Sequence, residues 1–102
     1  MQITLRIDEK EKIFTNDFVK ARVFRNALKI NQRIRENGEI TVDLFDELVE
    51  FVVIAFSNQF TVDEVWDGLE ARGLQPEIMR IFNDVLGFGG YETGEVQGDQ
   101  GN

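Results

Sequence analysis

The chain has 102 residues, no cysteine or histidine, and a formal net charge of −8. A chain of this length forms one small domain, and without cysteine it contains neither a disulfide nor a thiolate metal site. The acidic balance argues against nucleic-acid binding, which requires Lys and Arg to neutralise phosphates. No apolar run approaches the roughly 20 residues of a membrane span, and the N-terminus lacks the apolar region of a signal peptide. We therefore expect a cytoplasmic protein that binds neither nucleic acid nor membrane.

Residues 2–7 alternate between apolar and polar side chains, which is the pattern of a half-buried strand. A turn at 8–10 and a short return strand at 12–14 would complete a β-hairpin, although the chain has no Asn-Gly or Asp-Gly pair there to form the turn. We assign residues 1–14 to this hairpin.

The next segment, 17–36, has the periodicity of an amphipathic helix. Thr15, Asn16 or Asp17 is suited to cap its start, and Gly38 is suited to end it. Opposite the apolar arc, this helix carries a basic stripe, which is either a solvated surface or a docking face for a partner. The basic stripe consists of Arg22, Arg25, Lys29 and Arg33.

A second helix is predicted over 42–57, with Thr41 as its cap. From Phe51 to Phe56 six consecutive residues are apolar, and a helix that is apolar on every side is buried on every side. We therefore expect this half of the helix at the centre of the domain. A buried strand is the alternative for so short a run, but the length of the segment and an acidic face upstream favour the helix. That acidic face consists of Asp43, Asp46, Glu47 and Glu50.

Thr61 and Glu64 have the spacing of a capping box, which predicts the start of a third helix over 62–72. Trp66 falls in the apolar stripe of this helix, so we expect it to be a core residue rather than a recognition anchor. Gly73 is suited to end the helix.

Pro76 is suited to the first position of a last helix over 76–86. Six of the last sixteen residues are glycine, and we expect residues 87–102 to form a flexible, glycine-rich acidic tail. The predicted fold is mainly α: a small four-helix bundle-like domain over residues 1–86 with an N-terminal β-hairpin. It is α+β if the hairpin is counted.

The charges are segregated along the sequence. Residues 20–35 include six basic and no acidic side chains, whereas residues 36–70 include ten acidic and no basic ones. Such segregation favours complementary surfaces, within one molecule or between molecules, and self-association is one consequence to test. Two solvated helix faces of opposite sign are the alternative.

The residues required for common enzyme mechanisms are missing. With Ser57 as the one serine and no histidine or cysteine, the usual nucleophile–base pairs cannot be built. Carboxylates on a helical face are usually solvated, and general acid catalysis needs a raised pKa in an apolar pocket. The sequence GFGGYETG lacks the Lys-Ser/Thr of a phosphate-binding loop. We therefore expect no enzyme activity, no metal site and no cofactor.

Three segments read FVKARVFRNALKI, LVEFVVIAFSNQFTVDEVWDGL and PEIMRIFNDVLG. In order and spacing they resemble the tail assembly chaperones of long-tailed (siphovirus-type) bacteriophages and prophages. The likeness is concentrated at residues 51–56, 58–61, 63–65 and 68–69 and extends over roughly residues 1–88. These positions define a fold and carry no catalytic group.

The resemblance implies a protein that binds the newly made tape measure protein and keeps this long helical chain soluble. It also implies that the protein helps tail tube subunits polymerise around that chain in the bacterial cytoplasm and is absent from the mature virion. Members of this family are commonly made in a short form and a longer, frameshifted one, and the extension would begin near residue 87. For the partner, whether client or second copy, we select the basic stripe as the candidate binding face.

A phage-encoded acidic inhibitor that mimics the charge of DNA is the alternative function. It would require exposed acidic groups spaced like phosphates. In this chain the basic helix at 17–36 interrupts the acidic segments, which favours the chaperone.

Overall fold

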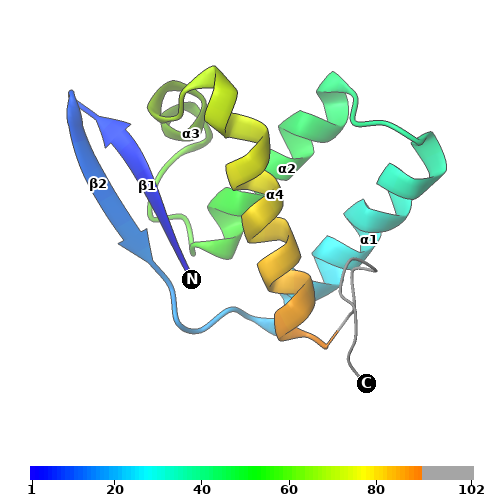
Figure 1. The fold of residues 1–102 in the computed structure, drawn as a ribbon. Coiled ribbons are helices and arrows are strands. Elements are labelled where there is room, and N and C mark those ends of the chain that lie inside the picture. Colours follow the sequence, from blue (N-terminus) through cyan, green and yellow to red (C-terminus); the bar gives the residue numbers. More distant parts are fainter. Residues whose placement is uncertain (91–102) are drawn as a thin grey trace.

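The computed structural model describes residues 1–90. A two-stranded antiparallel hairpin is followed by four helices (Figure 1), so the predicted helical fold with an N-terminal hairpin is confirmed as a small α+β domain. The last helix continues to Phe88, so its predicted end at 86 is wrong and the first two residues of the predicted tail are helical. From 91 onward the predicted tail lies outside the described residues. In chain order the elements are β1 (Gln2–Ile7), β2 (Lys10–Thr15), α1 (Ala21–Asn37), α2 (Val42–Ala55), α3 (Val62–Gly68) and α4 (Ala71–Phe88).

The hairpin is tighter than predicted. Ile7 pairs directly with Lys10, so the turn contains two residues, Asp8 and Glu9, and β2 begins earlier than the predicted return strand. Both turn residues have positive φ, 54° and 65°. This is the backbone of a type I′ turn, whose twist matches that of the paired strands. The strand pairing therefore imposes a conformation that neither Asp nor Glu signals in the sequence.

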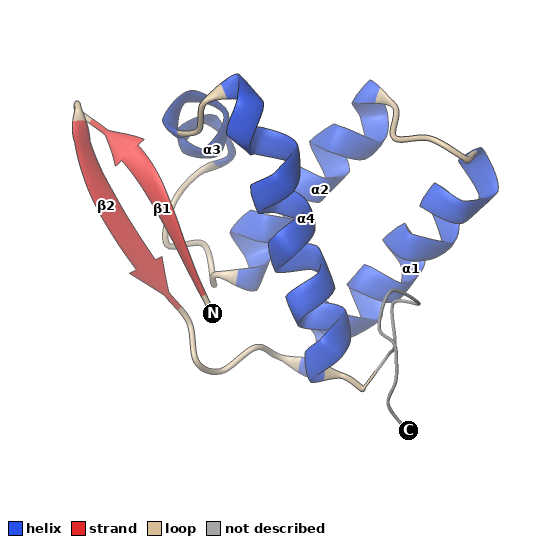
Figure 2. Ribbon diagram, viewed as in Figure 1, coloured by secondary structure: helices blue, strands red, loops and turns tan. Residues whose placement is uncertain are grey.

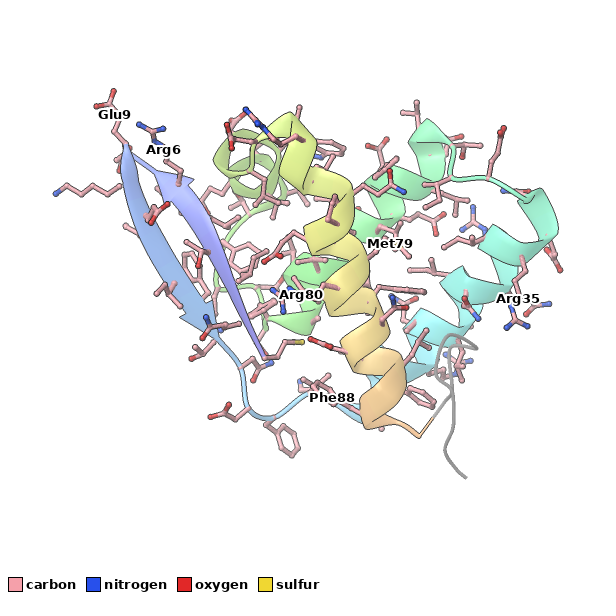
Figure 3. The ribbon with its side chains drawn as sticks, in the orientation of Figure 1. Arg6, Glu9, Arg35, Met79, Arg80 and Phe88 are labelled. Carbon is pink, nitrogen blue, oxygen red and sulfur yellow. The ribbon has the colours of Figure 1, made fainter. Side chains whose placement is uncertain are left out.

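The hairpin lies along one side of the helical part, with β1 between β2 and the helices (Figure 2). Ile3 and Leu5 of β1 are buried in the core. Arg80 of α4 points toward the start of β1 (Figure 3), where its guanidinium donates to the carbonyl of Gln2 at 2.8 Å. Arg80 also binds Glu77 of its own helix, and that hydrogen bond raises the pKa of the guanidinium. Arg80 thus fastens the hairpin to α4.

Helix α2 occupies the centre of the domain and contacts the other three helices. Phe51 is buried and packs edge-on against Phe82 of α4, with ring centroids 5.6 Å apart. Five of the six residues from Phe51 to Phe56 are buried, as predicted. The prediction is wrong for Ile54, whose side chain is 47% exposed, because it faces a groove beside α1 that no helix or strand of residues 1–90 fills.

Helix α1 begins at Ala21, four residues later than predicted, and has no side-chain cap. The cap prediction is wrong because Asn16 makes other bonds. Its amide donates to the carbonyl of Ala55 at 2.7 Å, and its Oδ1 accepts from the N–H of Phe18. Gly38 ends the helix in the left-handed conformation, as expected.

The capping box of Thr61 and Glu64 is present at the start of α3. This helix ends at Gly68, four residues before the predicted end, where a Cβ would lie 3.1 Å from the carbonyl oxygen of Arg6 in β1. Val65 is fully buried, whereas Trp66 is 37% exposed, so the prediction of Trp66 as a core residue is wrong. This short helix packs against β1 and α2 and buries only a narrow face.

Helix α4 starts at Ala71, and both Gly73 and Pro76 lie inside it, so the predicted helix end and helix start at these residues are wrong. The N–H of Gly73 donates to the carbonyl of Glu70 and forms the first turn. Pro76 removes one hydrogen bond near that end, and packing of the following residues against α1 and α2 maintains the helix. None of the helices within residues 1–90 is both long enough and apolar enough to cross a membrane.

Candidate partner-binding groove

Helix α1 presents the basic stripe on its exposed side. Val23, Ala27 and Ile30 are its buried residues. Arg35, on the same helix, points away from the rest of the domain (Figure 3). The structure therefore brings the four predicted site residues onto one exposed face of α1, spaced at three and four residues. These are Arg22, Arg25, Lys29 and Arg33.

The C-terminal end of the stripe is neutralised from within the domain. Arg33 forms a salt bridge and hydrogen bond with Glu47 of α2. This hydrogen bond raises the pKa of the Arg33 guanidinium, and the charges of Glu47 and Asp43 act in the same direction, against desolvation. Arg33 is therefore occupied, and of the four residues it is the least available to a partner.

The N-terminal part of the stripe has no such partner. Among residues 1–90, Arg22, Arg25 and Lys29 form no salt bridge with any carboxylate. Helices α1 and α2 run in opposite directions, since Arg33 late in α1 meets Glu47 early in α2. Arg22, early in α1, accordingly lies beside Ile54 at the end of α2. At this end, α2 offers an apolar side chain in place of a carboxylate.

Two adjoining pockets lie between the start of α1 and the end of α2, and we call them together the Ile54 groove. The first has a volume of ≈230 Å³. The second has a volume of ≈220 Å³ and shares Arg22, Val23 and Ile54 with the first. Arg25 and Asn26 complete the lining of the first pocket. The remaining lining of the second pocket is Asn16, Lys20, Ala55, Ser57 and Asn58.

Local backbone structure keeps the groove open. Ser57 and Asn58 follow α2 in the left-handed conformation, with φ of 59° and 60°, and they turn the chain toward the buried Phe60. The turn is held from the other side by Gln59, whose amide donates to the carbonyl of Thr15 at 2.7 Å. Because the chain turns away here, no other part of residues 1–90 covers Ile54, whose side chain stays about half exposed.

The groove combines an apolar floor with a cationic rim. Val23 and Ile54 form the floor, while Lys20, Arg22 and Arg25 contribute positive charge. Of the residues that the structure describes, no carboxylate lines either pocket, although the whole chain carries a net charge of −8. The chain has no histidine or cysteine, so the usual nucleophile–base pairs are absent from this lining. The groove is therefore suited to non-covalent binding of an anionic ligand with apolar side chains.

Sequence reasoning missed Ile54, although a signal for it exists. Along α2, Asp43, Glu47 and Glu50 follow one another at helical spacing, and Ile54 comes four residues after Glu50. It therefore continues the exposed acidic face. The unbroken apolar run concealed this position, because every residue in it was expected to be buried.

These features describe a small helical domain with a groove between α1 and α2 that is lined by basic and apolar side chains. The chain belongs to the phage tail chaperone protein family, whose model matches residues 1–100. This confirms the resemblance drawn from the sequence and favours a chaperone over the acidic inhibitor. Membership of a chaperone family implies a non-enzymatic role within the host cell. Searches of curated proteins and of solved structures returned no match.

Proposed function

We propose that this protein binds the tape measure protein of its phage and promotes assembly of the tail tube protein around it, in the cytoplasm of the bacterial host. It leaves before the tail is complete and is absent from the mature virion. The main support is the Ile54 groove, which places cations that form no salt bridge within residues 1–90 beside the exposed side chain of Ile54, in a chain of the phage tail chaperone family.

The physical properties of such a client match those of the protein. A long helix that is apolar along one side aggregates until another surface covers it. Many copies of a small acidic protein bound along it would mask the apolar side and make the complexes repel one another. Each contact can be weak, because neighbouring contacts on one client raise the effective concentration. Weak contacts allow tube subunits to displace the chaperone without a nucleotide or a catalytic step.

Self-association belongs to the same proposal. Copies bound side by side on a client would bring the basic stripe of one near the acidic face of α2 in the next. Asp43, Asp46 and Glu50 of that face form no salt bridge within residues 1–90. Contacts of this type are salt-sensitive and therefore reversible.

Co-expression with the cognate tape measure protein tests the proposal. We expect the tape measure protein to stay soluble and to co-purify with the wild-type chaperone, and to be insoluble when expressed alone. The double variant Arg22→Glu/Arg25→Glu should reduce co-purification. The matched control is Lys10→Glu/Lys12→Glu, which makes the same charge change at exposed positions on β2.

An insoluble tape measure protein in the presence of wild-type chaperone, with the chaperone alone in the supernatant, would contradict the proposal for this form. The same experiment with the longer frameshifted product would then decide whether the function belongs to that product.

A further inference from the structure

We propose that the Ile54 groove binds an amphipathic helix whose apolar residues are flanked by Asp or Glu. This inference deepens the proposed function, on which it rests, by naming the kind of client segment that the chaperone recognises. It follows from three properties of the groove: its shape, its charge and the absence of other recognition chemistry.

The shape fits side chains from one face of a helix. The two pockets have similar volumes, ≈230 Å³ and ≈220 Å³, and meet at Arg22, Val23 and Ile54. Side chains three or four residues apart on a helix are neighbours on its surface, so a pair of them can enter the two pockets together. An apolar pair would cover Ile54, whose side chain is about half exposed in the free protein.

The charge selects acidic flanks. Arg22 and Arg25 are three residues apart on α1 and line the same pocket, and Lys29 lies one turn further along. Like charges at this spacing on a helix repel one another, and in residues 1–90 no carboxylate relieves that repulsion by an ion pair. Carboxylates on the incoming helix would do so, and Arg forms two-point contacts with them.

Other ligand classes lack support in the groove. Within residues 1–90 no aromatic side chain lines either pocket, so this lining gives a nucleic-acid strand no surface on which its bases could stack. The lining residues belong to α1, to α2 and to loops, and none of them lies in a strand, so the described lining offers no strand edge to an extended peptide. Docking of a helix in a groove is the recognition mode that remains.

Fluorescence anisotropy with three synthetic peptides tests the inference on the full chain. One peptide forms an amphipathic helix with Leu at the apolar positions and Glu beside them. The second replaces each Glu with Lys, and the third replaces each Leu with Gln. We expect the first peptide to bind at least about tenfold more tightly than the other two, because both the charge and the apolar contacts are needed.

Variants locate the binding site. Ile54→Ser and Arg22→Glu/Arg25→Glu should each weaken binding of the first peptide about tenfold or more. Ile13→Ser and Lys10→Glu/Lys12→Glu make the same changes at exposed positions on β2 and should leave binding unchanged. Circular dichroism checks that each variant is folded. If a groove variant does not fold, chemical shift mapping of the wild type with the first peptide provides the same information, with shifts expected at residues 22–26 and 54–58.

Equal binding of all three peptides, no binding of the first, or shifts away from these residues would overturn the inference. A dimer of the free protein that Ile54→Ser dissociates would also overturn it, by identifying a second copy as the occupant of the groove. If the tape measure protein co-purifies while the acidic peptide fails to bind, this inference alone is wrong. If the peptide binds as expected while the tape measure protein stays insoluble, the proposed function is wrong and the groove is still a helix-binding site.

Discussion

The two ends of the basic stripe on α1 have the same residue types and the same helical face, but their surroundings differ. At the C-terminal end, Arg33 bonds to Glu47 of α2. At the N-terminal end, Arg22 and Arg25 line a groove whose neighbour on α2 is Ile54. The difference arises from α2, whose exposed face changes from carboxylates to an apolar side chain along its length.

This contrast indicates which part of a charged helix is available for binding. A cation that already has a carboxylate neighbour gains little when a partner offers another one. A cation without such a neighbour, beside exposed apolar surface, gains a charge-assisted hydrogen bond while apolar area is buried nearby. We therefore expect the two ends of one stripe to respond differently to the same substitution.

The largest effect is expected where α2 itself is disrupted, because its buried face positions both ends of the stripe. Phe51→Ala removes a buried ring that packs against Phe82 and should cost ~3–5 kcal/mol of unfolding free energy, out of a total of ~5–15 kcal/mol. Ile54→Ala, at an exposed position, should cost about 1 kcal/mol or less. Urea denaturation followed by circular dichroism measures both. Equal losses would mean that Ile54 is buried in solution, and the groove would then not exist.

The next largest effect concerns client binding. Arg22→Glu/Arg25→Glu should lower the amount of co-purified tape measure protein about tenfold or more, because two charge-assisted contacts are replaced by repulsion. Arg33→Glu should have a much smaller effect, since Arg33 is already paired with Glu47. Quantifying the tape measure protein in pull-downs with the two variants compares the ends directly. Equal losses would show that the stripe acts as a whole and that Ile54 does not define the site.

A smaller effect is expected from salt. Raising the ionic strength from ~0.1 M to ~1 M shortens the screening length from ~10 Å to ~3 Å. Sedimentation should then show weaker self-association and weaker binding of the acidic peptide by the wild type. Arg25→Glu and Lys29→Glu should reduce the difference between the two salt concentrations. Identical behaviour of wild type and variants in both buffers would assign the stripe to solvated surface.

Sequence reasoning identified features whose cause is local. Periodicity and the capping box of Thr61 and Glu64 placed the helices and one boundary, and spacing placed the basic stripe on one face. It failed where a distant contact decides the outcome. Asn16 bonds to Ala55, 39 residues away, and so does not cap α1.

The candidate site could be predicted only in part for the same reason. From charge alone, Arg22 and Arg33 were equally good candidates for binding a partner. Nothing in the sequence of α1 reveals which residue of α2 lies opposite each of them. Their difference depends on how α1 and α2 pack. Ile54 could have been recognised from the spacing of the acidic face, but its neighbours on α1 could not.

The smallest predicted effect tests most directly why the two ends of the basic stripe differ. Glu47→Gln removes the carboxylate that forms a salt bridge with Arg33. Because both side chains of this pair are partly exposed, at 47% and 37%, the loss of stability should lie between ~0 and 1 kcal/mol. The substitution also frees Arg33 and extends the unpaired part of the stripe along α1. Affinity for the acidic peptide should therefore rise, by about two- to threefold for a contact of ~0.5 kcal/mol, and anisotropy can resolve this.

Asp63→Asn, at an exposed position on α3, makes a matched charge change away from the stripe and should leave the affinity unchanged. An unchanged affinity for Glu47→Gln would show that the peptide is held by Arg22 and Arg25 alone, whereas a decrease would mean that the Arg33–Glu47 pair supports the shape of the groove.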